Sequence, residues 1–139
     1  MSLVLDSSVT LTWYFEDERT PETLGLLRHV AQAGAVVPAL WRLEVANGLQ
    51  MALRRGRITA EYRDASLSDL GSLAIATDPE TDNHAWEATV RLADRFRLTL
   101  YDAAYLELAQ RRHLPLATLD CPLRAAAGAL GVDLRGLAG

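Results

Sequence analysis

The chain contains no lysine. Its 14 basic residues are all arginine, against 18 acidic residues and a formal net charge of −4. A P-loop nucleotide site is therefore excluded, because that site needs a lysine on the phosphates. The acidic balance also argues against a protein that coats nucleic acid through a basic face, since such binding rests on the displacement of counterions. Any contact with nucleic acid must be local.

Cysteine and long apolar runs are also scarce. The single cysteine, Cys121, cannot form a disulfide within the chain and offers no paired thiols for zinc. No stretch approaches the roughly 18 apolar residues of a membrane span, and Asp6 interrupts the first apolar run before it reaches signal-peptide length. We therefore expect a soluble, cytoplasmic protein without a membrane segment. We also expect a single domain over residues 1–139.

Short apolar runs alternate with helical patterns along the chain. The runs predict strands within residues 3–5, 35–37, 74–76, 114–120 and 132–134. Periodicity and capping residues predict helices over residues 20–34, 40–53, 59–73, 82–96, 102–109 and 122–131. Thr20 with Pro21, and Asp82, are the expected starts of two of them, and the inner face expected for the 59–73 helix consists of Tyr62, Ala65, Leu70 and Leu73. This alternation predicts a three-layer α/β/α sandwich with a mostly parallel central sheet. Ligands bind such sheets at the carboxyl ends of strands, where strand order reverses.

Four acidic residues stand out from this pattern. Asp6 and Asp120 each follow a predicted strand, although a lone aspartate there is more often a turn residue or a helix cap. Glu44 and Asp102 lie within apolar stretches of predicted helices, where an ionised carboxylate needs a partner. The structural alternatives are a partly exposed helix flank for Glu44 and an N-cap for Asp102.

Convergence of the four acids would create a metal site. Mutual repulsion would raise their pKa values, and a bound dication would keep them ionised together. Oxygen ligands favour magnesium or manganese over zinc. Such a cation can orient a phosphodiester and lower the pKa of an attacking water. The residues therefore predict a hydrolytic phosphodiesterase site.

Four short motifs contain these acids, in this order: Val4-Leu-Asp6-Ser-Ser8, Leu43-Glu44-Val-Ala-Asn47, Tyr101-Asp102-Ala103 and Ala117-Thr118-Leu-Asp120. In these motifs the chain resembles the PIN domain over nearly its whole length, and within that family the small toxin ribonucleases of the VapC type. The resemblance implies a PIN-like fold and a Mg²⁺- or Mn²⁺-dependent endoribonuclease. The metal-binding and catalytic residues that it implies are Asp6, Glu44, Asp102 and Asp120. It gives supporting roles to three further residues, Ser8 and Thr118 as hydrogen-bonding neighbours and Asn47 as a candidate for orienting Glu44.

The resemblance also implies partners. Toxins of this type act on RNA, form homodimers and are held inactive by a small antitoxin that docks beside or into the acidic site. The aromatic segment Trp13-Tyr14-Phe15 and Trp41 could line a groove for an antitoxin helix, with core packing as the alternative. The arginines Arg54, Arg55 and Arg57 could bind RNA phosphates, or could simply stabilise the end of a helix.

Other enzyme classes fit these residues poorly. A phosphatase of the haloacid-dehalogenase type needs a second aspartate where Ser8 stands, and a response-regulator receiver needs a lysine late in the chain. The three histidines lack the spacing of a metal site, and no serine suggests a catalytic triad. A non-catalytic PIN-like binding or scaffold domain is the remaining alternative. The sequence leaves open the target RNA, the number of metal ions, the dimer surface and the antitoxin's identity.

Overall fold

A single five-stranded sheet organises residues 1–137, the part of the chain that the structure, a computed structural model, describes. The strands are β1 (Val4–Leu5), β2 (Ala35–Val37), β3 (Ile75–Thr77), β4 (Leu116–Ala117) and β5 (Leu134–Arg135). Their order is β3-β2-β1-β4-β5, and every neighbouring pair is parallel. The predicted parallel sheet is therefore confirmed, and its strand order reverses between β1 and β4.

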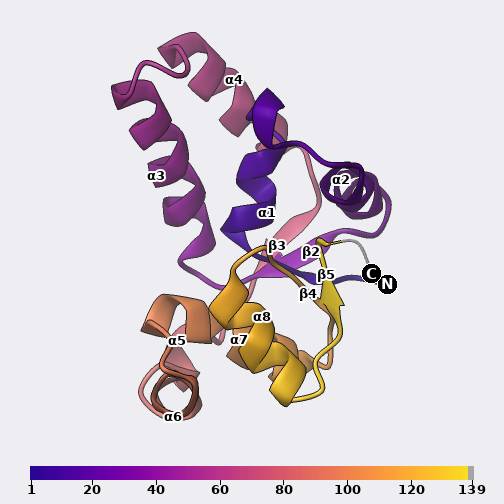
Figure 1. Ribbon diagram of the computed structural model, residues 1–139, viewed down its shortest axis with the longest axis vertical. Coiled ribbons are helices and arrows are strands. Elements are labelled where there is room, and N and C mark those ends of the chain that lie inside the picture. Colours follow the sequence, from indigo (N-terminus) through magenta and orange to yellow (C-terminus); the bar gives the residue numbers. More distant parts are fainter. Residues whose placement is uncertain (138–139) are drawn as a thin grey trace.

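Helices cover both faces of this sheet. They are α1 (Ser7–Thr12), α2 (Pro21–Ala33), α3 (Trp41–Arg54), α4 (Ala60–Gly71), α5 (Thr81–His84), α6 (Ala88–Phe96), α7 (Leu100–Arg112) and α8 (Cys121–Ala129), with a 3-10 turn η1 (Glu16–Glu18). Figure 1 shows α1 and α2 above the sheet and α7 and α8 below it, which confirms the three-layer α/β/α arrangement. The α3–α4 pair projects to the upper left, and α5 and α6 lie at the lower left.

The centre of the core lies between β1, β4 and α7. Val4 and Leu5 of β1 and Leu116 and Ala117 of β4 are inaccessible to solvent, as expected of strands covered on both faces. Helix α7 is buried continuously from Ala103 to Ala109, because it packs on β1 and β4 and is itself covered by α6 and α8. The α7 residues are therefore held firmly relative to the ends of β1 and β4.

The best-predicted helix is α2. Thr20 caps it, and its hydroxyl accepts a hydrogen bond of 3.1 Å from the backbone N–H of Thr23, whose own hydroxyl accepts one from the backbone N–H of Thr20. Pro21 occupies the first turn, as predicted. Gly34 ends the helix with a φ of +76°, and a Cβ there would lie 2.8 Å from the carbonyl oxygen of Ala74. Both its conformation and its close approach to the neighbouring chain require glycine.

Three helix predictions need correction. The single helix predicted over residues 82–96 is wrong, because two helices occupy this segment: α5 ends at His84 and α6 begins at Ala88. Asp82 lies inside α5 and therefore does not cap a helix. The hydroxyl of Thr81 contacts Asp78 and the backbone of Ala39, which starts α5 early. Helix α7 begins at Leu100 rather than near residue 102. In α4 the buried residues are Ser66 and Leu70, whereas the predicted inner-face residues 62 and 65 are exposed.

The sequence pattern gave no indication of α1, whose six residues follow β1 directly. Among residues 1–137, no helix combines the length and the apolar character needed to cross a bilayer.

Candidate metal centre

Asp6 lies at the carboxyl end of β1 and is only 4% exposed. The hydroxyls of Ser8 and Thr118 each donate a hydrogen bond of 2.7 Å to its Oδ2. Burial raises the pKa of Asp6, the two hydrogen bonds oppose that rise, and the nearby charge of Asp120 adds to it. The two hydrogen bonds thus hold the Asp6 carboxyl group in one orientation. Ionising this buried group costs free energy unless a cation lies nearby.

Asp120 follows β4, the strand beside β1, and therefore lies next to Asp6 at the same edge of the sheet. Its Oδ2 accepts a hydrogen bond of 3.0 Å from the backbone N–H of Leu123 and caps α8. The helix-cap role predicted as the alternative for Asp120 is therefore confirmed. Capping uses one carboxylate oxygen, and the charge of Asp120 still raises the pKa values of Asp6 and Asp102.

Glu44 projects from α3 and is partly buried. Its Oε1 accepts a hydrogen bond of 2.5 Å from the hydroxyl of Tyr105 and a longer one of 3.4 Å from Ser7. Burial raises the pKa of Glu44, the bond from Tyr105 opposes the rise, and the charges of Asp6 and Asp102 increase it. Glu44 therefore faces the other acids, which a solvated helix flank would not do.

Asp102 lies in the first turn of α7, where its backbone N–H donates to the Thr99 hydroxyl at 3.1 Å. Thr99 is the N-cap of α7, so the N-cap alternative for Asp102 is wrong. Burial raises the pKa of Asp102, and the charges of Asp120 and Asp6 raise it further.

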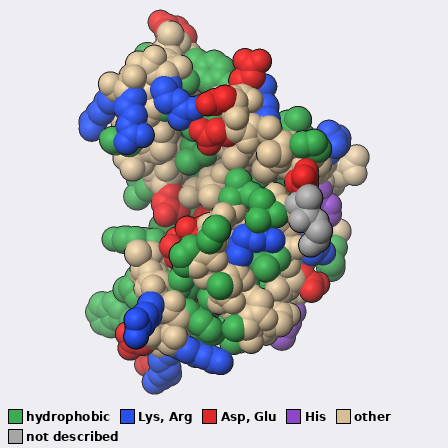
Figure 2. Space-filling view, in the orientation of Figure 1, with side chains coloured by type: hydrophobic (Ala, Val, Ile, Leu, Met, Phe, Trp, Pro, Cys, Tyr) green, Lys and Arg blue, Asp and Glu red, His purple; other side chains and the backbone are tan. Residues whose placement is uncertain are grey.

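The four acids come from four different elements and meet where the strand order reverses. Each of Asp6, Glu44 and Asp102 has its pKa raised by the charge of at least one other member. Figure 2 shows acidic side chains in a notch at the left of the molecule, between the projecting α3–α4 pair and the α5–α6 region. Asp6 itself is buried, but Glu44, Asp102 and Asp120 are partly exposed, so the acidic site opens to solvent.

The donor chemistry of this cluster fits a hard divalent cation. Its ligands are all oxygens, and the mutual repulsion of carboxylates would be relieved by positive charge. In their present positions, no three His, Cys, Asp or Glu side chains among residues 1–137 could hold a metal ion. Binding would therefore require the carboxylates to turn toward one another.

Asn47 does not support Glu44 as the resemblance implied. It is exposed, and within residues 1–137 it makes no hydrogen bond to Glu44. Tyr105 and Ser7 donate to that carboxylate instead, and neither was singled out from the sequence. The only available signal was the spacing of Asp102 and Tyr105, since residues three apart in a helix lie on the same face.

The four aromatic side chains considered for a partner groove are core residues. Trp13, Tyr14, Phe15 and Trp41 are 4–9% exposed. The indole N–H of Trp13 donates to the carbonyl oxygen of Thr23 at 2.7 Å, as buried tryptophans usually require. The packing alternative is therefore confirmed for all four.

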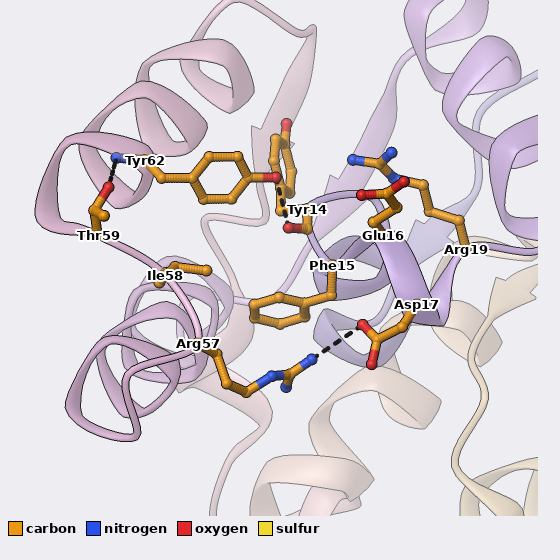
Figure 3. Close-up of a pocket in the computed structure, with 9 residues that line it drawn as sticks. All are labelled: Tyr14, Phe15, Glu16, Asp17, Arg19, Arg57, Ile58, Thr59 and Tyr62. Atoms are coloured by element: carbon orange, nitrogen blue, oxygen red, sulfur yellow. Dashed lines mark hydrogen bonds and ion pairs between the residues drawn. The ribbon is translucent and has the colours of Figure 1, made fainter.

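Phe15 and Tyr14 also border a cavity of about 920 Å³ between η1 and the turn that joins α3 to α4 (Figure 3). Arg57 crosses this cavity, lies 4.5 Å from the centroid of the Phe15 ring and pairs with Asp17 at 3.2 Å and Glu18 at 3.0 Å. Arg54, Arg55 and Arg57 are all exposed, and Arg57 is paired within the chain. None of the four acids lines the cavity.

A second polar cluster was missed because it joins distant segments. Arg111 of α7 donates to Asp78 Oδ2 at 2.6 Å and to Glu107 Oε2 at 2.7 Å. Burial favours protonation of Asp78, but the hydrogen bonds from Arg111 and Thr81 outweigh it and lower the pKa of that carboxyl. This cluster ties the end of β3 to α7.

Comparisons with known proteins bear on the family and the fold of this chain. Residues 3–129 match the PIN domain family. Ribonuclease VapC3 of Pyrobaculum aerophilum is 31% identical over 121 residues, which cover 86% of this chain and 90% of that protein.

Solved structures share the fold. VapBC2 from Rickettsia felis, bound to a DNA fragment from its promoter, matches with a TM-score of 0.67 and 11% identity over 98% of each chain. VapC20 of Mycobacterium tuberculosis, a toxin that cleaves the sarcin-ricin loop, matches with a TM-score of 0.64 and 16% identity over 89% of this chain and 94% of that one.

Proposed function

We propose that this chain, which belongs to the PIN-domain family, is a metal-dependent endoribonuclease that acts as the toxin of a toxin–antitoxin pair. The observation that carries the proposal is the approach of Asp6, Glu44, Asp102 and Asp120 at the reversal of strand order, where the charges of Asp6, Asp102 and Asp120 raise the pKa values of Asp6, Glu44 and Asp102. Similarity to Ribonuclease VapC3 supports RNA as the substrate.

In this proposal the four carboxylates hold Mg²⁺ or Mn²⁺. When bound, the cation would supply Lewis-acid activation of the phosphodiester and charge for the transition state. The chain's own residues prepare the site. Ser8 and Thr118 fix Oδ2 of Asp6, and the backbone N–H of Leu123 fixes Oδ2 of Asp120. Oδ1 of Asp6 accepts a long 3.5 Å hydrogen bond from the hydroxyl of Ser7, and this oxygen and Oδ1 of Asp120 are the ones we propose for the cation.

Hydrolysis of the RNA backbone requires water to attack phosphorus while the bond to a ribose oxygen breaks. Figure 2 shows the notch open to solvent, so water can reach it. Hydrogen bonds to Asp6, Glu44 and Asp120 already restrict these acids, and metal binding then requires the carboxylates to turn toward one another. Because the net charge is −4, we expect RNA to bind only near the notch rather than over a wide basic surface.

We also propose two protein partners, an antitoxin and a second copy of this chain. The VapBC2 structure supports an antitoxin, and the family resemblance suggests a homodimer. Large apolar side chains are exposed beside the acids: Leu43 precedes Glu44 and is 77% exposed, and Tyr101 precedes Asp102 and is 63% exposed. Trp86, between α5 and α6, is 91% exposed. Contiguous exposed apolar surface marks interaction sites, and these three side chains are our candidates for contact with a partner.

The test is RNA cleavage by purified protein. We expect cleavage with Mg²⁺ or Mn²⁺, none in chelator, recovery when the metal is restored, and no cleavage by Asp6→Ala or Asp102→Asn. Full activity in chelator, or undiminished cleavage by these variants, would contradict the proposal. RNA binding without cleavage under every metal condition would favour the non-catalytic alternative.

A further inference from the structure

The hydroxyl of Tyr105 makes a 2.5 Å hydrogen bond to Oε1 of Glu44, shorter than the 2.7 Å bonds to Asp6. Tyr105 is completely buried in α7, so its hydroxyl is the one polar group that the side chain must satisfy in the interior. It meets this requirement with a partly buried acid of the proposed metal centre. A hydrogen bond to an ionised carboxylate is among the stronger kinds in proteins.

The position of Tyr105 follows from helix geometry. Asp102 and Tyr105 are three residues apart in α7, so both side chains lie on the face directed at the acids. Glu44 comes from α3, which packs mainly against α1 and α4 and projects from the sheet. The bond from Tyr105 therefore connects a projecting helix to the best-packed helix of the core.

We infer that Tyr105 is a positioning residue of the proposed metal centre, whose hydroxyl fixes the Glu44 carboxylate through Oε1 and leaves Oε2 as the oxygen available to a cation. Within residues 1–137 the hydrogen bonds to this carboxylate, from Tyr105 and Ser7, both fall on Oε1. Without the bond, Glu44 could adopt several rotamers, and ordering them would cost affinity when metal binds. This inference rests on the proposed function.

A purely structural role makes a different prediction. A phenylalanine would fill the same space, so if the hydroxyl served only packing and stability, its removal would change the free energy of unfolding but not metal binding. If it positions Glu44, removal weakens metal binding in a folded protein. Loss of an outer hydrogen-bonding partner typically weakens metal affinity by about 10–100-fold.

The experiment compares Tyr105→Phe with wild type by calorimetric titration of Mn²⁺ and by RNA cleavage kinetics. We expect Mn²⁺ affinity to fall about 10–100-fold and kcat to fall at saturating RNA with little change in KM. In a Glu44→Gln background, the same substitution should have no further effect. Tyr62→Phe is the matched control, because its hydroxyl donates at 2.6 Å to the carbonyl oxygen of Tyr14, away from the acids.

Wild-type Mn²⁺ affinity and kcat in folded Tyr105→Phe would overturn the inference, as would an equal effect with and without Glu44. If the variant does not fold, the Tyr105 ring signals of the wild type can be followed by NMR during titration with Mg²⁺. They should move with Mg²⁺ binding and stay unchanged in Glu44→Gln; unchanged signals in saturated wild type would overturn the inference. Should wild type cleave no RNA with either metal, or cleave fully in chelator, the proposed function itself fails, which is distinguishable from failure of Tyr105 alone.

Discussion

The hydroxyl of Thr118 donates a 2.7 Å hydrogen bond to Oδ2 of Asp6, across the two strands at which the sheet reverses its order. The hydroxyl oxygen of Thr118 also accepts a 3.0 Å hydrogen bond from the backbone N–H of Asp120. One buried hydroxyl thus fixes the relative positions of two of the four acids, although 112 residues separate Asp6 from Thr118 along the chain.

The first prediction removes this hydroxyl. We expect Thr118→Val to lower the free energy of unfolding by about 1–3 kcal/mol, because it leaves buried polar groups without a partner. Mn²⁺ affinity and RNA cleavage should fall as well. Chemical denaturation and calorimetric titration measure the two effects.

The matched control is Thr12→Val. Thr12 is also buried, and its hydroxyl donates to the carbonyl oxygen of Val9 at 2.6 Å without contacting an acid. It should lose comparable stability and keep wild-type Mn²⁺ affinity. Equal Mn²⁺ affinity in both variants would show that Thr118 has no role in the site.

The second prediction concerns pH. The pKa values of Asp6, Glu44 and Asp102 are raised in the folded protein, so the folded state binds their protons more tightly than the unfolded chain does. Without metal, stability should therefore decrease as pH rises from about 4, the ordinary carboxyl pKa, through the raised values. Asp78 has a lowered pKa and acts oppositely: its contribution is present above about pH 4 and is lost as pH falls through its lowered pKa.

Thermal unfolding in chelator from pH 4 to pH 8 measures this dependence. Asp6→Asn should flatten the decrease and raise the Tm at pH 7.5, because it removes a carboxylate that is costly to ionise. A lower Tm with an unchanged pH slope would contradict the electrostatic account of the site.

The third prediction tests the Arg111 cluster. Asp78 and Glu107 have side chains only 1% and 6% exposed, and Arg111 pairs with both. Arg111→Ala should cost about 3–5 kcal/mol of unfolding free energy, because it leaves buried carboxylates without their cation. Urea denaturation measures the loss, and Arg112→Ala is the control because its side chain is exposed. A loss below about 1 kcal/mol for Arg111→Ala would show that the ion pairs add little.

The fourth prediction concerns self-association. If the chain forms a homodimer, sedimentation should give twice the monomer mass of 15.2 kDa. Trp86→Ser should shift the equilibrium toward monomer, since a side chain 91% exposed gains most from being covered. Leu137→Ser, another exposed apolar position at 53%, serves as control. A monomeric wild type at all concentrations would reject the dimer.

The sequence predicted the parts of this fold that depend on local pattern. Short apolar runs ending in Asp6 and Asp120 identified β1 and β4, and the Thr20 cap with Pro21 identified α2. The parallel order then required both aspartates to lie at one edge of the sheet. The prediction that Glu44 and Asp102 belong to the site depended on the family resemblance, because no local sequence pattern shows that two helices direct carboxylates at the same place.

The missed features are contacts between distant segments. The bond from Tyr105 to Glu44 spans 61 residues and the pair of Arg111 with Asp78 spans 33. The start of α5 at Thr81 also involves a tertiary contact, in which the Thr81 hydroxyl accepts a hydrogen bond from the backbone N–H of Ala39. Periodicity cannot reveal such contacts, since it reports only which face of an element is apolar.

The most direct test of the central claim is calorimetric titration of Mn²⁺ into wild type, Asp6→Asn, Asp102→Asn and the control Asp133→Asn. Asp133 precedes β5 and so lies at the opposite edge of the parallel sheet from Asp6. We predict binding by wild type and Asp133→Asn, and affinity weakened by more than about 10-fold in the other two, since even an outer hydrogen-bonding partner is worth that much. Wild-type affinity in Asp6→Asn and Asp102→Asn would contradict the claim that these acids hold the metal.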